Sequence, residues 1–124
     1  IAGKAGIEQE TFAVTDAESE LVLGAIGLGH AIDGVCEIGY WIRADARGRG
    51  ATTRALVLLS RDALGREGVE RVQLRADVQN ISSCRVAEKA GFTREGVLRS
   101  AHWNARLGRR QDWAMYSLLP ADLT

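Results

Sequence analysis

The most regular stretch of the chain, RVQLRADV at residues 71–78, alternates apolar and polar side chains. A period of two predicts a strand with one buried face and one wet face. The segments on both sides have a helical pattern instead. In residues 51–68 small or apolar side chains return every four positions before Gly68, and residues 80–92 open on the capping candidates Asn80, Ser82 and Ser83. A strand between two helices restricts the chain to folds in which helices pack on a sheet.

Further strands are expected before and after this helix–strand–helix unit. The polar turn AESE separates two strand-like runs and predicts a hairpin, and a polar, glycine-containing loop joins the last two strands. The additional strands are predicted at residues 9–16, 20–31, 35–43, 92–101 and 111–119, and the last loop at residues 102–110. In residues 35–43, Glu37, Gly39 and Trp41 point to one face and the more apolar side chains to the other. This order predicts a mixed sheet with helices packed on it.

The glycine-rich segment GAIGLG, residues 24–29, has a glycine spacing close to that of a dinucleotide-binding motif. That motif needs a strand followed directly by a helix. Here the dipeptide Asp33-Gly34 predicts a further turn, and no helical pattern follows. We therefore interpret the segment as a strand with bulges.

Composition narrows the class of protein. The 124 residues suffice for one domain, residues 1–124, with its own buried core. Sixteen basic and 16 acidic side chains give a formal charge of zero, so no overall field favours nucleic acid or an anionic membrane. The two cysteines and two histidines have no disulfide-framework or metal-ligand spacing. From this spacing we expect no metal site. No apolar run reaches about 18 residues, so we expect no membrane span, and a cytoplasmic location is the default expectation.

The sequence RGRG at residues 47–50 lies directly before the first predicted helix. Gly48 and Gly50 allow the backbone to bend sharply and to approach a ligand closely. The first amides of a helix lack internal partners and carry partial positive charge, to which Arg47 and Arg49 add full charges. The turn is therefore a candidate phosphate site, and the alternative is a solvated turn into a helix. It is not a Walker loop, because no Gly-Lys-Ser/Thr follows.

Two motifs together resemble the GNAT superfamily of acyl-CoA-dependent N-acyltransferases. The segment 47–50 resembles its pyrophosphate loop, Arg/Gln-x-x-Gly-x-Gly/Ala. The segment NISSCRVAEKAGF matches its second signature at Asn80, Ser83, Lys89, Gly91 and Phe92. The stretches EIGYWIR, RVAEKAGF and REGVLR are similar to the branch of ribosomal-protein N-terminal acetyltransferases (RimJ/RimL-like). The resemblance implies an α/β (α+β) fold with a mixed, mostly antiparallel, twisted sheet and helices packed on it.

The resemblance also implies acetyl-CoA as the acyl donor. Backbone amides at the glycine turn would hold the diphosphate, and amides at the end of the strand at 35–43 would polarise the thioester carbonyl and pair with the pantetheine arm. The second motif would add hydrogen bonds to that arm. The implied cofactor-binding residues are Ile42, Arg43, Arg47, Gly48, Arg49, Gly50, Ala51, Thr52, Asn80 and Ser83. Otherwise Asn80 only caps the second helix.

Three departures from the family pattern stand out. Thr52 occupies the last position of the loop pattern, where it would either crowd a phosphate or offer it a hydroxyl. Ala87 occupies a position where many members have a tyrosine that protonates the departing thiolate. The usual strand and helices before the hairpin are also missing, because only about ten residues precede it. Part of the acceptor pocket is therefore expected to lie outside this sequence.

Acyl transfer to an amine needs a neutral amine and a stabilised carbonyl oxygen. Our candidate for the carboxylate that removes the proton, directly or through water, is Glu37, and the alternative is an exposed charge on a half-wet strand. Ser83 is the nearest candidate hydroxyl for the leaving thiolate, with helix capping as its rival role. Cys84 is interpreted as inert, because no paired histidine would support a nucleophile. Residues Asp112, Trp113 and Tyr116 are candidates for the acceptor side, and core packing explains the aromatic pair equally well.

These observations predict an acetyl-CoA-dependent N-acetyltransferase that attacks the thioester directly with a primary amine. The amine belongs to a protein N-terminus, an amino acid or a small molecule. The alternative is a non-catalytic CoA-binding or interaction module with the same fold. Binding of nucleic acid through the arginines between residues 85 and 110 is disfavoured, because acidic residues interrupt them and no stacking array accompanies them. Uncovered edge strands predict a homodimer.

Overall fold

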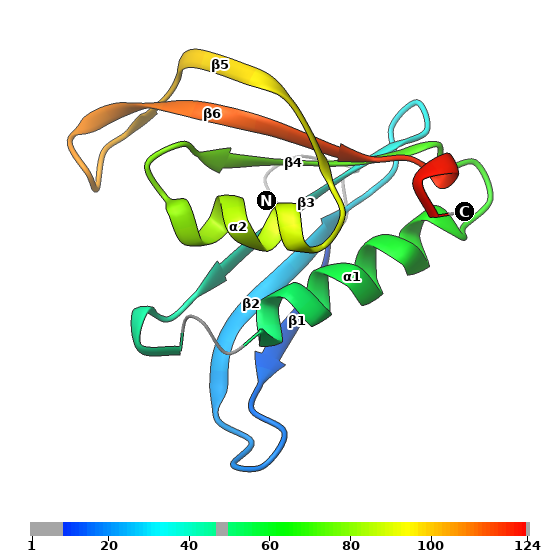
Figure 1. Ribbon diagram of the computed structural model, residues 1–124, viewed down its shortest axis with the longest axis horizontal. Helices are drawn as coiled ribbons and strands as arrows, with labels where there is room; N and C mark the ends of the chain where they lie inside the picture. Colours follow the sequence, from blue (N-terminus) through cyan, green and yellow to red (C-terminus); the bar gives the residue numbers. More distant parts are fainter. Residues whose placement is uncertain (1–8, 47–49, 124) are drawn as a thin grey trace.

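In the computed structural model, which describes residues 9–46 and 50–123, six strands form one sheet and two helices pack on it (Figure 1). The strands are β1 (Gln9–Thr15), β2 (Val22–Gly29), β3 (Val35–Ile42), β4 (Arg71–Asp77), β5 (Thr93–Asn104) and β6 (Arg109–Leu118). The helices are α1 (Ala51–Leu64) and α2 (Ile81–Lys89), with short 3-10 turns at η1 (Ala44–Ala46) and η2 (Pro120–Leu123). The strand order is β1-β2-β3-β4-β6-β5. The β3–β4 pair is parallel and the other neighbouring pairs are antiparallel, which confirms the predicted fold class.

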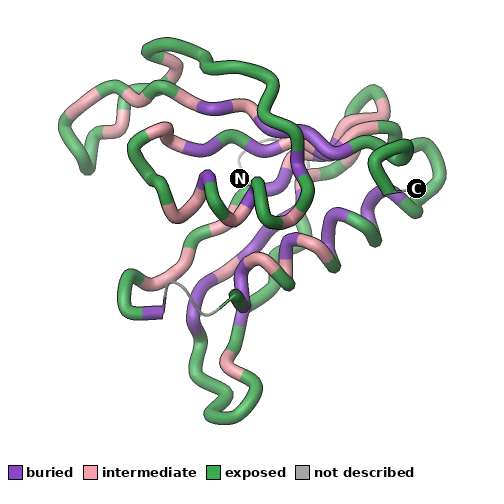
Figure 2. The backbone as a smooth tube through the Cα atoms, viewed as in Figure 1, coloured by how far each residue is buried: buried purple, intermediate pink, exposed green. Residues whose placement is uncertain are grey.

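The core lies between the sheet and its two helices, which contact each other on one face. Leu56 of α1 is fully buried, as are Val72 of β4 and Tyr116 of β6. Figure 2 shows the buried positions in the middle of the strands and at intervals along α1. The predicted alternation of β4 holds, because Val72, Leu74 and Ala76 are buried while the side chains between them lie on the other face. None of the helices in the described ranges is long and apolar enough to cross a bilayer.

The first three strands form the predicted meander. β1 and β2 are a hairpin, and β2 turns into β3 at Asp33 and Gly34, whose φ angles of 52° and 76° suit a two-residue hairpin turn. The segment GAIGLG lies inside β2, so it is not a dinucleotide-binding motif. Gly24 has a packing role instead. A Cβ atom there would lie 2.1 Å from the carbonyl oxygen of Trp41.

The end of α1 differs from the prediction. The helix ends at Leu64 with Gly65 as its C-cap, and it does not continue to Gly68. The Gly65 amide donates to the carbonyls of Arg61 and Asp62, which closes the last turn. Gly68 lies in the turn before β4 with φ of 84°. Both Gly65 and Gly68 follow the helix closely, and the sequence pattern favoured Gly68, which was wrong.

The connection between the last two strands is also shorter than predicted. The expected loop at 102–110 is mostly strand, because β5 runs to Asn104 and β6 begins at Arg109. The turn is closed by Asn104, whose carbonyl accepts from the Gly108 amide at 2.9 Å and whose side-chain oxygen accepts from the Leu107 amide at 3.1 Å. Gly108 supplies the positive φ of 67° that this tight turn requires.

The centre of the sheet is open on one side. β3 pairs with β4 only where Val35–Glu37 meet Arg71–Gln73, and beyond Glu37 the two strands separate. On its other edge β3 remains paired with β2 as far as Ile42. The second half of β3 therefore has one free edge, which faces a wedge-shaped gap between β3 and β4.

Candidate functional site

A cavity of about 370 Å³ occupies this wedge. Its walls come from the free end of β3, from the first turns of α2 and from the β5–β6 turn. The lining residues are Tyr40, Trp41, Ile42, Asn80, Ser82, Ser83, Val86 and Arg106. Three of the predicted site residues, Ile42, Asn80 and Ser83, are thus brought together from segments that lie about 40 residues apart in the sequence.

The backbone of β3 separates two of the predicted cofactor contacts. The Arg43 amide donates to the Leu23 carbonyl at 2.8 Å, so it points to β2 and is not available to a ligand in the wedge. The prediction of a ligand contact from the Arg43 amide is therefore wrong. Successive amides of a strand point to opposite edges, so the Ile42 amide points to the open edge. The Arg43 guanidinium is also engaged, with Asp45 at 2.6 Å and with the Val22 carbonyl at 3.2 Å.

Tyr40 connects the two walls of the cavity. Its hydroxyl donates to the Ser83 carbonyl at 2.7 Å, which ties β3 to the first turn of α2 across the gap. Burial raises the pKa of Tyr40 to about 12, although the hydrogen bond to Ser83 acts in the opposite direction. Tyr40 therefore stays a neutral donor at physiological pH and fixes the separation of the two walls. Periodicity predicted only that its side chain lies on the more apolar face of the strand.

The N-terminus of α2 is closed by Asn80. The Asn80 side-chain oxygen accepts from the Ser83 amide at 3.1 Å, which is a helix cap. Ser83 is therefore not the cap, and its half-buried side chain lies on the cavity wall. The Asn80 side-chain nitrogen still has two donors for a ligand. Both residues line the cavity.

The N-terminus of α1 is built differently. Its N-cap is Gly50 with φ of 77°, and no described side chain caps the helix. The Thr52 side chain is 2% exposed and its hydroxyl has no hydrogen-bond partner among the described residues. Thr52 thus points inward and does not crowd the surface of the turn. An uncapped helix start fits a phosphate group, because the amides of its first turn have no described side-chain partner. The predicted contacts Arg47, Gly48 and Arg49 lie outside the described residues.

Glu37 lies at the apex of the wedge but on the sheet face away from the helices, which we call the outer face. Its carboxylate accepts from Gln73 Nε2 at 2.9 Å and from Arg75 Nε at 2.7 Å, and its side chain is 35% exposed. The Arg75 guanidinium in turn lies 4.6 Å above the Trp113 ring. Glu37 is therefore an ion-paired carboxylate. Glu37 and Ser83 lie on opposite sides of β3, so they do not act on the same atom from the same face.

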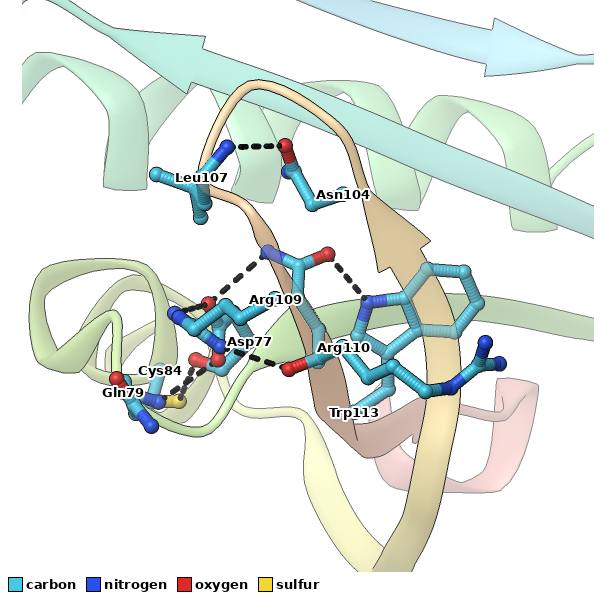
Figure 3. Close-up of polar contacts among 9 residues, drawn as sticks. Asp77, Gln79, Cys84, Asn104, Leu107, Arg109, Arg110 and Trp113 are labelled. Atoms are coloured by element: carbon cyan, nitrogen blue, oxygen red, sulfur yellow. Dashed lines mark hydrogen bonds and ion pairs between the residues drawn. The ribbon is translucent and has the colours of Figure 1, made fainter.

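The β5–β6 hairpin is anchored beside the cavity by Asp77, at the end of β4 (Figure 3). The Asp77 carboxylate accepts from Arg109 at 2.7 Å, from Gln111 at 3.0 Å and from the Gln79 amide at 3.0 Å. Burial opposes ionisation of this carboxyl, but the three hydrogen bonds together lower its pKa. Asp77 thus holds the hairpin against the entrance to α2. The sequence showed Asp77 only as a polar residue of an alternating strand.

The remaining candidates divide between the core and the outer face. Tyr116 is fully buried and donates to Glu88 at 2.8 Å, so it packs in the core and does not line an acceptor site. Asp112 accepts from the Ser100 amide at 2.7 Å, while Trp113 stacks on His102 on the outer face. Cys84 is buried and is not paired in a disulfide. Within the described ranges no three His, Cys, Asp or Glu side chains gather as a metal site.

Comparison with known proteins decides the family. A family model described as an acetyltransferase (GNAT) domain matches residues 3–93. The chain belongs to the GNAT acetyltransferase family. The match includes β1 to α2 and therefore both walls of the wedge that β3 and α2 supply.

Three relatives show the extent of the similarity. The chain is 37% identical over 99 residues to "Putative ribosomal N-acetyltransferase YdaF" of Bacillus subtilis (strain 168). The aligned region covers 77% of this chain and 52% of that protein. The crystal structure of a "putative acetyltransferase" from T. thermophilus superposes with a TM-score of 0.82 at 30% identity, over 97% of this chain and 62% of that one. The acetyltransferase MccE, solved with acetyl-CoA and AMP, superposes with a TM-score of 0.71 at 28% identity, over 80% of this chain and 55% of that one. The chain thus spans about half the length of YdaF.

Proposed function

We propose that the protein is an acetyl-CoA-dependent N-acetyltransferase that moves an acetyl group to a primary amine on a protein N-terminus, an amino acid or a small molecule. The observation that carries this proposal is the wedge. The free edge of β3 faces the first turn of α2 across a cavity of about 370 Å³, and the Tyr40–Ser83 hydrogen bond fixes the distance between the two walls. An extended ligand that carries amides of its own suits this arrangement, because it can pair with β3 as a strand would.

The proposed cofactor contacts come from the N-termini of the two helices and from the free edge of β3. The Ile42 amide, the Asn80 side chain and the Ser83 hydroxyl would hold the pantetheine arm. The first amides of α1, from Ala51 and Thr52 behind Gly50, would hold the diphosphate, together with Arg47, Gly48 and Arg49. Acetyl-CoA supplies an acyl group that is already activated as a thioester.

The residues of the chain would provide positioning and proton transfer. The incoming amine must first lose a proton, and Glu37 would accept it through a water molecule, because both of its oxygens retain free lone pairs beside Gln73 and Arg75. The amine nitrogen then bonds to the carbonyl carbon while the carbon–sulfur bond breaks. The departing sulfur takes up a proton from solvent or from the Ser83 hydroxyl. A thiol with an ordinary pKa of about 8.5 is a good enough leaving group that Ala87 in place of the family tyrosine does not prevent the reaction.

The test combines calorimetry with CoA and thiol-release kinetics with acetyl-CoA and a panel of amines. We expect CoA to bind and thiol to be released only when an amine is present. The variant Glu37→Gln should keep the affinity for CoA and lower kcat, because the amide cannot accept the proton of the amine. Absence of CoA binding by the folded protein would overturn the proposal.

A non-catalytic CoA-binding module remains the second candidate. The observation that favours it is the engagement of the Glu37 carboxylate, because Gln73 and Arg75 already donate to its two oxygens and compete with a water molecule for them. In that case CoA binds in the calorimeter, but no amine in the panel releases thiol from acetyl-CoA. The two candidates therefore give different results in the same pair of experiments.

A further inference from the structure

We propose that Arg106 selects the acceptor, by binding a carboxylate that the acceptor carries close to its reactive amine. Arg106 lies in the turn between β5 and β6 and lines the cavity together with the end of β3 and the first turns of α2. The inference rests on the proposed function and adds the chemical class of the acceptor. Amino acids fit this class, whereas polyamines do not.

The charge of the cavity lining is the first observation. Among the described lining residues, Arg106 alone is charged, and the others are aromatic, aliphatic, hydroxyl or amide side chains. No described carboxylate lines the cavity. A polyamine acceptor would bring its remaining ammonium groups toward a like charge, which is unfavourable, while an acceptor with a carboxylate would gain an ion pair.

The second observation is that the neighbouring arginines of the hairpin are already engaged. Arg109 binds Asp77 at 2.7 Å, and Arg110 binds the Ser100 carbonyl at 2.9 Å and 3.1 Å. Arg106 has no hydrogen bond or ion pair with any described residue, and so its five guanidinium N–H donors remain for a ligand. Arginine binds a carboxylate with two parallel hydrogen bonds, which fixes both the position and the orientation of the bound group.

The third observation is the way the turn is held. Asn104 and Gly108 close it through the hydrogen bonds described above, and Asp77 fastens the following strand to the end of β4. Figure 3 shows the Asn104–Leu107 contact at the tip and Asp77 with Arg109 below it. The backbone that carries Arg106 is therefore fixed against the same element that leads into α2. Trp41 adds an exposed aromatic wall, 56% accessible, for the apolar part of an acceptor.

The test uses two amines that differ only in the carboxylate, L-phenylalanine and phenethylamine, with spermidine as a third acceptor. We expect the wild-type kcat/KM to be at least tenfold higher for phenylalanine than for phenethylamine. Arg106→Gln should raise the KM for phenylalanine at least tenfold and leave kcat and the phenethylamine kinetics nearly unchanged. Arg106→Lys should recover part of the loss. Arg99→Gln, a matched charge removal on the same hairpin outside the cavity, should behave as wild type.

A binding measurement separates this inference from the proposed function. Phenylalanine is titrated into the CoA-loaded protein in a calorimeter, for wild type and for Arg106→Gln. Binding that depends on Arg106 without any thiol release would support the inference and refute catalysis. The inference would be wrong if the two amines were used equally well, if spermidine were preferred, if phenylalanine did not bind, or if Arg106→Gln weakened CoA and not the acceptor.

Discussion

The N-termini of the two helices are built in opposite ways. At α2 the chain caps its own helix, because the Asn80 side chain accepts from the Ser83 amide, and the Tyr40 hydroxyl holds the same turn by donating to the Ser83 carbonyl. At α1 the helix begins at Gly50 in a left-handed conformation, with no described side chain as a cap. The contrast indicates a division of roles. The α2 end is a wall held by its own contacts, whereas the α1 end keeps uncapped donors to which the proposed function assigns the diphosphate.

The largest expected effect is at the open end. Gly50→Asp places a carboxylate where a phosphate is proposed to bind, and we expect CoA affinity in calorimetry to fall tenfold or more, which is about 1.4 kcal/mol. The matched control is Gly50→Asn, since asparagine has the same shape and also tolerates a positive φ. Asn should cost much less CoA affinity than Asp. Equal losses for the two variants would mean that backbone strain, and not charge, decides binding at this turn.

The next effect concerns the cap of α2. Asn80→Ala removes both the cap and the side-chain donors, so it should lower the unfolding free energy by about 1 kcal/mol and also weaken CoA binding. Asn80→Asp keeps the cap but loses the donors. Thermal unfolding should therefore be nearly unchanged for Asp while its CoA affinity falls. If Asp binds CoA as wild type does, then Asn80 is a cap and nothing more.

A smaller effect is expected at the link between the walls. Tyr40→Phe removes the hydroxyl that donates to the Ser83 carbonyl, and we expect a loss of about 1 kcal/mol in unfolding free energy and a severalfold weaker affinity for CoA. The pKa of Tyr40 is about 12 in the folded chain against 10.0 ordinarily, so its contribution is complete below pH 10 and is lost as the pH rises toward 12. Alkaline denaturation should therefore be shallower in the variant than in wild type over that interval. Unchanged CoA binding would show that the link is not needed to set the cavity width.

The smallest effect is expected at Thr52. Its buried hydroxyl has no partner among the described residues, so Thr52→Val should keep the unfolding free energy or raise it by up to about 1 kcal/mol. Thermal unfolding in the absence of ligand measures this change. A clear loss of CoA affinity in the same variant would show instead that the Thr52 hydroxyl turns toward the bound phosphate. The phosphate would then be bound by a side chain as well as by backbone amides.

Local sequence patterns predicted the elements, because strand alternation and helical spacing depend on nearby residues. The strand at 71–78 and the turn at Asp33-Gly34 were correctly predicted from such signals, while Asn80 was one of three capping candidates and the structure selects it over Ser82 and Ser83. The end of α1 was not, since Gly65 and Gly68 give nearly the same signal and only the backbone bonds of Gly65 distinguish them. The self-association and cytoplasmic location expected from the sequence stay predictions.

The candidate site was predicted less completely, because its geometry depends on contacts between distant segments. The family resemblance named Ile42, Asn80 and Ser83 as cofactor contacts, and the structure brings these three residues to one cavity. Strand register, which the sequence does not show, decides that the Arg43 amide donates to β2 and that the Glu37 carboxylate accepts from Arg75. Arg106 carries no motif, and only the path of the β5–β6 hairpin brings it to the cavity.

The short β3–β4 pairing has one further consequence. Only three residue pairs join β3 to β4, so few backbone hydrogen bonds hold the two halves of the sheet together. A ligand that lies along the free edge of β3 would pair with the backbone there, so it would act as a seventh strand as well as a reactant. Amide hydrogen exchange along the second half of β3 should then slow when CoA is added, and the melting temperature should climb with the logarithm of its concentration.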